Sequence, residues 1–333
     1  MKVLVTGASG FIGRNVLLRA PRSWQIVAVC HRSTDLDTFV LEQQLAHVRV
    51  VRCDLTDAAS VGRLAEGDGV FDACLYLAAN GDPAKSADRP AWDLQLNTLA
   101  LVTCLEKIRV GHLVYVSSGA VYDGLSGAVT PAVPVAPRLP YAISKLASEQ
   151  YVRAFAERTK TVGSFVNVRF FGAYGPYEPA RKITTRWIHG LMSGQREFVI
   201  RGNGENLIDF MYVDDAVDGF LVLMSAAGYS GTLDFASGAP VSVNAVVQTM
   251  ARVLGAGMTI RHEGQTEEYI EFRSADTTMR DRFGVVPRVT FEDGVRRLND
   301  FLQKAGGPPP RSALRRAAPE QSVGGKACTT ASE

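Results

Sequence analysis

The chain has 333 residues, of which 46% are hydrophobic and 21% are charged, and its formal net charge at pH 7 is +2. A chain of this length and apolar content can bury a full doubly wound core together with a smaller appended lobe. The nearly balanced charge gives no reason to expect a nucleic acid or an anionic membrane surface as a partner, and neither is predicted.

The sequence shows no sign of export, membrane insertion or metal binding. Its apolar N-terminus is too short for a signal peptide or a membrane span and is broken by glycines. The five cysteines show neither C-x-x-C pairing nor metal-ligand spacing, and four of them lie in apolar contexts. The histidines are isolated and are interpreted as surface or packing residues. We therefore predict a cytoplasmic protein with reduced, buried cysteines and no metal site.

The N-terminus predicts a dinucleotide-binding turn. Residues 2–6 are typical of a short buried parallel strand, and residues 7–13 follow with a glycine at every third position. Glycines let the backbone turn tightly and approach a pyrophosphate at the N-terminus of the next helix. The spacing differs from the G-x-G-x-x-G fingerprint, so a plain tight turn is the alternative. A second apolar strand at residues 25–30 favours a βαβ unit and therefore a nucleotide site.

The residues after this second strand favour NADP over NAD. A βαβ unit places here the group that meets the adenosine ribose, and the chain has His31 and Arg32 rather than an acidic residue. A carboxylate would bind the ribose 2′-hydroxyl and repel a 2′-phosphate, whereas a guanidinium can bind that phosphate in bidentate fashion. The alternative is that Arg32 is a solvated loop charge and that Asp35 or Asp37 approaches the ribose.

The middle of the chain alternates between strands and helices. Further strands are predicted at residues 48–54, 73–79, 112–118 and 164–169, and helices at residues 94–108 and 140–158. This alternation predicts a mostly parallel sheet that is covered by helices, with functional sites at the carboxyl ends of its strands. Asp54, Ala78, Ala79 and Ser118 lie at such ends. The stretch from about residue 305 lacks apolar periodicity, and we predict that it is disordered.

Three side chains predict acid and base chemistry. Tyr141 and Lys145 are one helical turn apart and share a helix face, so the lysine ammonium is expected to lower the pKa of the phenol from its usual value near 10. Ser118, at a strand end, can donate a hydrogen bond to a carbonyl oxygen that the same tyrosine protonates. A lone Y-x-x-x-K usually belongs to an ordinary amphipathic helix. Its occurrence together with a nucleotide-binding turn and Ser118 favours the catalytic interpretation here.

These features together resemble the extended short-chain dehydrogenase/reductases, in the branch of NAD(P)-dependent nucleotide-sugar epimerases and dehydratases. The resemblance covers the chain up to about residue 300. The matching segments are residues 6–13 (TGASGFIG), 54–55 (DL), 77–79 (LAA), Asn97, 117–122 (SSGAVY), 141–145 (YAISK), 169–176 (RFFGAYGP), 202–204 (GNG) and 209–215 (DFMYVDD).

The resemblance implies an α/β fold, with a doubly wound parallel Rossmann sheet and a smaller, interleaved C-terminal substrate lobe. The implied dinucleotide-binding domain covers residues 1–172, with residues 211–238 returning to it. Residues 173–210 and 239–304 would form the substrate lobe, and residues 305–333 the disordered tail. Members of the family commonly form homodimers through two helices per subunit, so a homodimer is expected.

The resemblance also implies individual contacts. The implied catalytic residues are Ser118, Tyr141 and Lys145. The implied cofactor-binding residues are Gly7, Gly10, Phe11, Ile12 and Gly13 at the pyrophosphate, His31 and Arg32 at the ribose, Asp54 and Leu55 at the adenine, Leu77, Ala78 and Ala79 along the passage to the nicotinamide, and Asn97, Tyr141, Lys145 and Phe171 at the active site. The implied substrate-binding residues are Ser118, Gly172 and Arg273.

Some residues depart from the family pattern. Dehydratases of this branch place an acidic pair after the catalytic serine or threonine, and this chain has Gly119 and Ala120 there, which disfavours dehydration. The arginine that usually precedes Asp-Phe is Ile208, so one phosphate-binding charge is missing. Arg181 and Lys182 are candidates to replace that charge, and a solvated basic face is the equally weighted alternative.

Three functions follow from these residues. The favoured one is an NADPH-dependent reductase of the 4-keto group of a nucleotide-linked sugar. A 4-epimerase that retains NAD would use the same three side chains. A dinucleotide-binding redox sensor without catalysis is the third, although such a sensor has no need of all three side chains.

Overall fold

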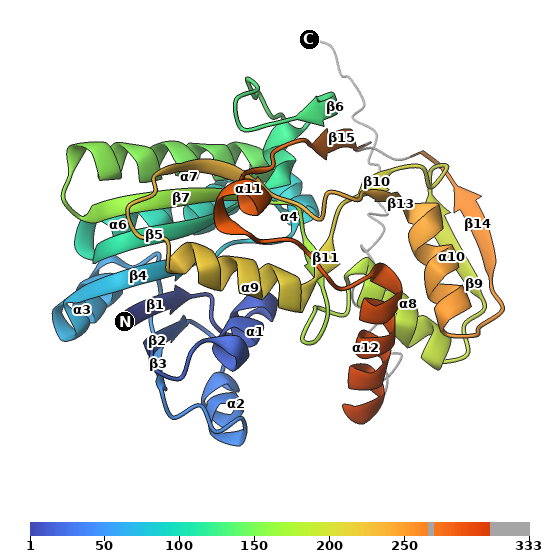
Figure 1. Cartoon of the computed structure of the whole chain (residues 1–333), viewed down its shortest axis with the longest axis horizontal. Coiled ribbons are helices and arrows are strands. Elements are labelled where there is room, and N and C mark those ends of the chain that lie inside the picture. The colour runs from blue at the N-terminus through green and yellow to red at the C-terminus, as the bar shows by residue number, and fades with distance from the viewer. Residues whose placement is uncertain (266–269, 307–333) are drawn as a thin grey trace, which may run out of the picture.

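The computed structural model describes residues 1–265 and 270–306, and a parallel sheet lies at the centre of this part of the chain (Figure 1). Seven strands within the described residues form it, in the order β12-β7-β5-β4-β1-β2-β3. Their bounds are β1 (Lys2–Thr6), β2 (Gln25–Cys30), β3 (Val48–Arg52), β4 (Val70–Tyr76), β5 (Arg109–Ser118), β7 (Val162–Phe170) and β12 (Gly231–Phe235). All neighbouring strands in it are parallel, which confirms the predicted doubly wound α/β class.

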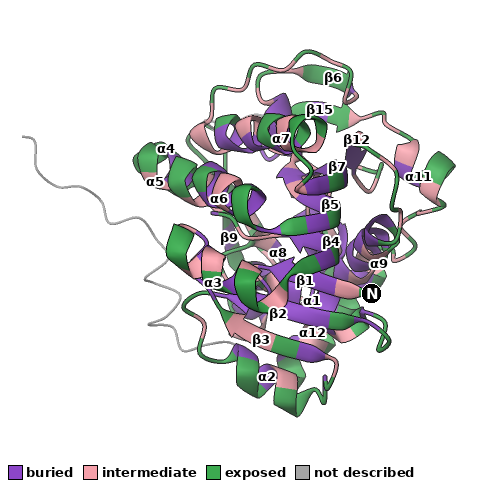
Figure 2. Cartoon of the chain, turned by 90° about the vertical axis from the view of Figure 1, so that its left-hand side faces the viewer, coloured by how far each residue is buried: buried purple, intermediate pink, exposed green. Residues whose placement is uncertain are grey.

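Helices cover both faces of the sheet, because its strands are apolar on both sides. The helices on one face are α1 (Phe11–Arg19), α2 (Leu36–Glu42) and α9 (Val213–Met224). Those on the other face are α3 (Ala58–Asp68), α6 (Ala100–Lys107) and α7 (Pro140–Arg158). Figure 2 shows the buried residues concentrated in the central strands between these two layers.

The predicted helix at residues 94–108 is instead three consecutive segments. They are α5 (Pro90–Leu94), a π-helical turn η1 (Gln95–Leu99), and α6. The apolar spacing along this stretch does not distinguish a π turn from an α turn, so the π turn could not be predicted from the sequence. The wider turn is notable because π turns inside helices often occur at functional sites.

The other predicted elements are present with shifted ends. The strand predicted at residues 73–79 runs over Val70–Tyr76, the one at 112–118 begins at Arg109, and the one at 164–169 runs over Val162–Phe170. The helix at residues 140–158 matches α7. Boundaries shift because terminal residues lack the neighbours that fix an interior residue.

The remaining elements lie outside the central layers. They are α4 (Pro83–Asp88), η2 (Gly119–Tyr122), β6 (Ser126–Val129), β8 (Ala173–Tyr174), α8 (Ile183–Met192), β9 (Glu197–Arg201), β10 (Leu207–Ile208), β11 (Met211–Tyr212), β13 (Val241–Ser242), α10 (Val243–Val253), β14 (Thr259–Glu263), β15 (Glu271–Ser274), α11 (Thr278–Phe283) and α12 (Phe291–Lys304). Figure 1 shows α8, α10, α12, β9 and β14 together at one end of the molecule. By contrast, α11 packs on β12 and α9 of the central layers. The predicted domain boundaries stay a prediction.

Cysteines and one histidine are placed in the core. Cys30, Cys53, Cys74 and Cys104 are buried and free, as expected from their apolar contexts. His112 is fully buried, where its imidazole bonds to Ser164 and to the carbonyl of Leu223.

Cys328 and residues 307–333 of the predicted tail lie outside the described residues. Within the described residues, no helix has the length and apolar character needed to cross a bilayer.

Candidate active site

The turn between β1 and α1 is shaped for close backbone approach. Gly7 has a φ of 65°, and a Cβ there would lie 2.9 Å from the amide nitrogen of Ala78. A Cβ at Gly13 would lie 2.6 Å from the carbonyl oxygen of Gly7. Gly10, the N-cap of α1, supplies no side-chain cap, so the first backbone N–H groups of the helix are available to an anion. These features fit the pyrophosphate of a dinucleotide.

Strand β4 ends against the same turn. The hydroxyl oxygen of Thr6 accepts hydrogen bonds from the backbone N–H groups of Leu77 (3.1 Å) and Ala78 (3.2 Å). These bonds hold the carboxyl ends of β1 and β4 together where the strand order reverses, which is where doubly wound sheets bind their ligands. The predicted cofactor residues Phe11 and Ile12 begin α1 and are half-buried, and Ala79 is exposed after β4.

At the end of β2, both carboxylates weighed as ribose ligands already have arginine partners. Asp35 accepts from Arg14 at 2.6 Å, and Asp37 accepts from Arg52 at 2.7 Å. Arg32 is exposed. The engaged carboxylates make Asp35 and Asp37 less available to a ribose hydroxyl.

His31 and Asp54 lie close together after β2 and β3. Nε2 of His31 lies 3.5 Å from Oδ2 of Asp54. Burial tends to raise the pKa of Asp54, but hydrogen bonds from Thr56 and the charges of His31 and Arg32 lower it overall. Leu55, the other residue predicted at the adenine, is buried in the core beneath. The strand ends thus bring together the residues that were predicted at the adenosine.

The structure brings the three predicted catalytic side chains together. Ser118 ends β5, and Tyr141 and Lys145 lie in the first two turns of α7. The hydroxyl of Ser118, which accepts from the backbone N–H of Ala120 at 3.1 Å, is close enough to the phenol of Tyr141 to affect its pKa. Nζ of Lys145 donates to the carbonyl oxygen of Val116 at 2.9 Å and lies 5.9 Å from the centre of the Tyr141 ring. A hydroxyl, a phenol and an ammonium therefore share the carboxyl end of β5.

Burial governs the protonation of these groups. It raises the pKa of Tyr141, with the nearby hydroxyl of Ser118 acting against the rise and the charge of Asp93 adding to it. Burial also lowers the pKa of Lys145 to about 8, and the charges of Asp93 and Glu149 act against this decrease. The predicted lowering of the Tyr141 pKa is wrong for this structure, because burial of the phenol raises its pKa and the Lys145 ammonium donates to a backbone carbonyl instead of to the phenol.

Asn97, on the π turn, is buried and bonds to neighbouring elements. Its Oδ1 accepts from the backbone N–H of Asn80 at 2.6 Å, and its Nδ2 donates to Ser144 at 3.0 Å. These contacts connect Asn80, four residues beyond the end of β4, to helix α7. They fit a supporting role for Asn97, whereas its direct contact with a cofactor stays a prediction.

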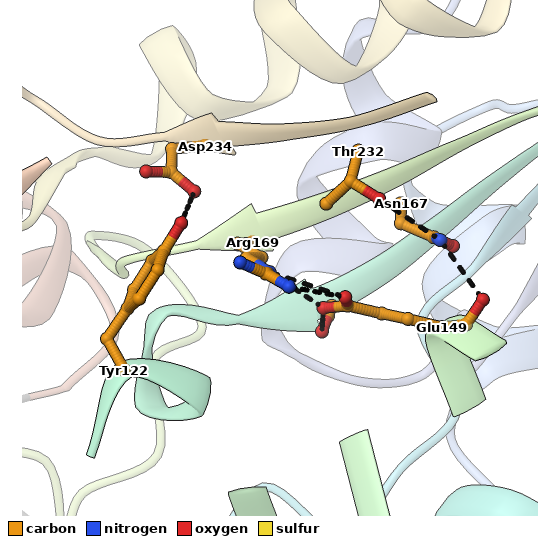
Figure 3. A network of polar contacts seen from close by, with 7 residues as sticks. Tyr122, Glu149, Asn167, Arg169, Thr232 and Asp234 are labelled. Atoms are coloured by element: carbon orange, nitrogen blue, oxygen red, sulfur yellow. Dashed lines mark hydrogen bonds and ion pairs between the residues drawn. The ribbon is translucent and has the colours of Figure 1, made fainter. Parts of the chain in front are cut away.

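A second buried network anchors α7 to the sheet, as Figure 3 shows. Arg169 on β7 forms an ion pair with Glu149 on α7 at 2.9 Å, and both side chains are almost completely buried. The Arg169 guanidinium also lies 5.0 Å from the ring centre of Tyr122, whose hydroxyl donates to Asp234 on β12 at 2.8 Å. Burial raises the pKa of Asp234 to about 6. Glu149 was missed from the sequence, although its place one helical turn after Lys145 was a usable signal.

The predicted cofactor residue Phe171 and the predicted substrate residues Gly172 and Arg273 are spread over several elements. Phe171, after β7, packs against Tyr122 and Phe272, and its backbone N–H donates to the carbonyl of Phe235 at 3.0 Å. Gly172 follows with a φ of 142°, and its carbonyl accepts from Met211. Arg273, on β15, is exposed, and the structure gives it no contact with the catalytic trio.

Comparison with known proteins places these features in a family. A model of the NAD dependent epimerase/dehydratase family matches residues 3–233. The dTDP-glucose 4,6-dehydratase of Streptomyces niveus is 27% identical over 311 residues, covering 89% of this chain and 90% of that protein. The UDP-glucose 4-epimerase of Mycolicibacterium smegmatis is 26% identical, covering 91% of this chain and 99% of that protein.

Solved structures agree with the fold. MoeE5, in complex with UDP-glucose and NAD, is 26% identical and has a TM-score of 0.80, covering 92% of this chain and 100% of that chain. The UDP-glucose 4-epimerase of Thermotoga maritima is 22% identical with a TM-score of 0.81, covering 92% of this chain and 99% of that chain. The match to the family, which extends over more than half of the sequence, is consistent with the parallel sheet and the glycine-rich turn. The chain therefore belongs to the NAD dependent epimerase/dehydratase family.

Proposed function

We propose that this protein reduces the 4-keto group of a nucleotide-linked sugar with NADPH. The observation that carries the proposal is the meeting of Ser118, Tyr141 and Lys145 at the end of β5, in the same sheet whose strand β1 leads into the glycine-rich turn. The dinucleotide, when bound, supplies the hydride that adds to the carbonyl carbon. Residues 173–210 and 239–304 are proposed to hold the sugar nucleotide.

Each catalytic side chain then has one task. The phenol of Tyr141, which burial keeps protonated, donates its proton to the carbonyl oxygen as negative charge develops there. Ser118 donates a hydrogen bond to the same oxygen and polarises the carbonyl. Lys145 holds a positive charge nearby and favours the phenolate that remains after proton transfer. The proton lost by Tyr141 is replaced from solvent between turnovers.

The residues after Ser118 argue against a dehydratase. Dehydration needs an acidic pair, and the chain has Gly119 and Ala120 at those positions. A Cβ at Gly119 would lie 3.1 Å from ring carbons of Phe171, which is closer than ordinary van der Waals contact. An acidic side chain at this position would therefore require the ring of Phe171 to shift. This supports reduction or epimerisation, even though relatives such as the S. niveus protein are dehydratases.

Arg32 supports NADP as the cofactor. It stands where a carboxylate would select NAD, and both nearby carboxylates, Asp35 and Asp37, are paired with other arginines. An exposed guanidinium at this position can bind a 2′-phosphate in bidentate fashion. The solved relative MoeE5 binds NAD, so cofactor preference is a point on which this chain is proposed to differ.

Two arginines support a negatively charged sugar nucleotide as the substrate. Arg181, just before α8, reaches across to the residues after β4, with its Nε 3.5 Å from Asp82 and its Nη2 donating to the carbonyl of Gly81. Arg273 is exposed on β15 and is proposed to bind the diphosphate. Arg273, together with Arg181 once the diphosphate displaces Asp82 from it, would supply the positive charge that Ile208 does not provide.

A 4-epimerase that retains NAD is the alternative function. It is favoured by the names of two similar proteins, the UDP-glucose 4-epimerase of M. smegmatis and MoeE5 with UDP-glucose and NAD. In that reaction Tyr141 first removes the proton of the 4-hydroxyl and later returns it. The same trio serves both reactions, so the net use of cofactor distinguishes them.

The test is to incubate the purified protein with nucleotide-linked 4-keto sugars plus NADPH, and separately with 4-hydroxy sugar nucleotides plus NAD. Oxidation of one NADPH for each keto sugar consumed, followed by absorbance and product mass, is the expected result. Interconversion of two 4-hydroxy sugars without net change in cofactor would establish the epimerase instead. Cofactor binding without turnover of any sugar would overturn both and leave a binding protein.

We also propose a homodimer. Four large apolar side chains are exposed on neighbouring helical segments: Leu94 on α5, Leu99 on η1, and Ile143 and Tyr151 on α7. Such a cluster is typical of a surface that is covered by a partner. Light scattering of the wild type should give twice the chain mass, and Leu99→Glu should give a monomer. A wild-type monomer would refute the proposal.

A further inference from the structure

We infer that Asp93 is a positioning residue for Tyr141 and Lys145, an inference that rests on the function proposed above. Asp93 lies on α5, its side chain is fully buried, and it belongs to none of the motifs found in the sequence. A buried carboxylate is costly unless it is fully hydrogen-bonded. The contacts of this one therefore indicate what it does.

All three polar partners of the Asp93 side chain are donors. Oδ1 accepts from Nδ2 of Asn80 at 2.7 Å and from Nδ2 of Asn97 at 3.0 Å. Oδ2 accepts from the hydroxyl of Ser144 at 2.7 Å. An ionised carboxylate only accepts hydrogen bonds, so this donor set matches the charged form.

These partners connect Asp93 to the segments that carry the proposed chemistry. Ser144 lies on α7 between Tyr141 and Lys145, and Asn80 follows β4 directly after Ala79. Asn97 links the two, because its side chain bonds to both Asn80 and Ser144. Loss of the carboxylate would remove the shared acceptor and loosen α7 relative to the end of β4.

The charge of Asp93 also acts on both titrating groups. The titratable groups around the Lys145 ammonium are Asp93 from α5, Glu149 and Tyr141 from α7, and Tyr115 from β5. The negative charge of Asp93 raises the pKa of Lys145, against burial, and adds to the raised pKa of Tyr141. Asp93 thus keeps the ammonium charged in a buried place and keeps the phenol protonated until it donates.

Asp93→Asn tests both roles, with Asp88→Asn as the matched control. Asp88 is an exposed aspartate at the end of α4, close in the sequence, and its loss removes the same charge from the surface. Ionisation of Tyr141 is followed by tyrosinate absorbance, as the difference between each protein and the same protein carrying Tyr141→Phe. This titration needs no substrate. Cofactor affinity and the pH profile of kcat complete the measurements.

We expect Asp93→Asn to lower kcat about tenfold or more, to leave cofactor affinity within about twofold, and to move the tyrosinate titration to lower pH. The alkaline decrease in kcat should also begin at lower pH, because Lys145 loses its proton sooner. Asp88→Asn should change none of these. An unmoved titration in a folded Asp93→Asn variant would overturn the inference.

The outcomes separate the inference from the proposed function. Wild-type turnover in Tyr141→Phe would refute the proposed acid, whereas the titration of the Asp93 variant would still report on Asp93. If Asp93→Asn fails to fold, Ser144→Ala removes one of the three donors and keeps the charge. That variant should lower kcat without shifting the tyrosinate titration, and an unchanged kcat would refute the positioning role.

Discussion

The ends of β1 and β4 are proposed to hold the cofactor, and Arg181 and Arg273 are proposed to bind the substrate, but these two regions are built from different materials. The first is a backbone structure, with Gly7, Gly13 and Thr6 closing a turn in which a side chain would not fit. The second presents the long exposed side chains of Arg181 and Arg273. Backbone geometry suits a cofactor common to a whole family, whereas exposed arginines can change with the substrate.

The buried ion pair of Arg169 and Glu149 anchors α7 to the sheet, and its loss should have the largest effect. Arg169→Met leaves the Glu149 carboxylate buried without its partner and should lower the free energy of unfolding by about 3–5 kcal/mol in urea. Arg296→Met, which breaks an exposed ion pair with Asp293, should cost less than about 1 kcal/mol. Equal decreases in the free energy of unfolding in the two variants would show that burial does not strengthen the contribution of the Arg169–Glu149 pair.

On the catalytic side, Tyr141→Phe should reduce the chemical step by about two orders of magnitude or more. Cofactor binding should stay nearly unchanged, because the glycine-rich turn does not depend on the phenol. Single-turnover kinetics and a cofactor titration measure the two quantities separately. Wild-type turnover would remove Tyr141 from the acid and base role.

At the adenosine end, Arg32→Asp should move the preference from NADP toward NAD by about tenfold or more, since a charged hydrogen bond contributes about 1.5–3 kcal/mol. The ratio of kcat/KM for the two cofactors measures it. Arg52→Asp is not a neutral control because Arg52 pairs with Asp37, so exposed Arg63→Asp serves instead. An unchanged ratio would place Arg32 outside the site.

On the substrate side, Arg273→Ala should raise the KM for the sugar nucleotide about tenfold and leave kcat within about twofold. Arg280→Ala, at an exposed arginine on α11 that pairs with Asp281, should change neither. Initial rates at varied substrate give both constants. A decrease in kcat without a change in KM would assign Arg273 to the chemistry instead of to binding.

The smallest expected effect is on the pH dependence of stability, through the buried core residue His112. Burial lowers the pKa of His112, so the unfolded chain takes up a proton first as the pH falls through about 6.5. Stability that is present above this pH is therefore lost below it. Urea unfolding at pH 7.5 and 5.5 measures how far the free energy of unfolding decreases between these pH values. The decrease should be smaller in His112→Gln than in the wild type. His262→Gln, at an exposed histidine, should behave like the wild type.

The contrast between the two regions also explains what the sequence could predict. Strands such as β1 and β2 were predictable because an apolar run between turn residues has few other interpretations, and Gly7 and Gly13 were predictable because the turn tolerates no side chain. Ser118, Tyr141 and Lys145 were recognisable from their spacing and from the family resemblance. Their meeting at one strand end follows from the parallel topology.

Other features depended on contacts between distant segments. Asp93 carries a charge and looks like a surface residue, and its burial is visible only once Asn80, Asn97 and Ser144 surround it. The raised pKa of Tyr141 likewise follows from its surroundings in space and not from Lys145 one turn away. Local spacing predicts which side chains share a face, but it does not predict the desolvation that sets their protonation.

The contact between Gly119 and Phe171 has a consequence for how the reaction type can change over evolution. Because a side chain at position 119 would press on the aromatic ring, an acidic replacement there is unfavourable while Phe171 keeps its size and place. Substitution at position 119 is therefore coupled to residue 171, since the ring must yield by a few tenths of an ångström or be replaced by a smaller side chain.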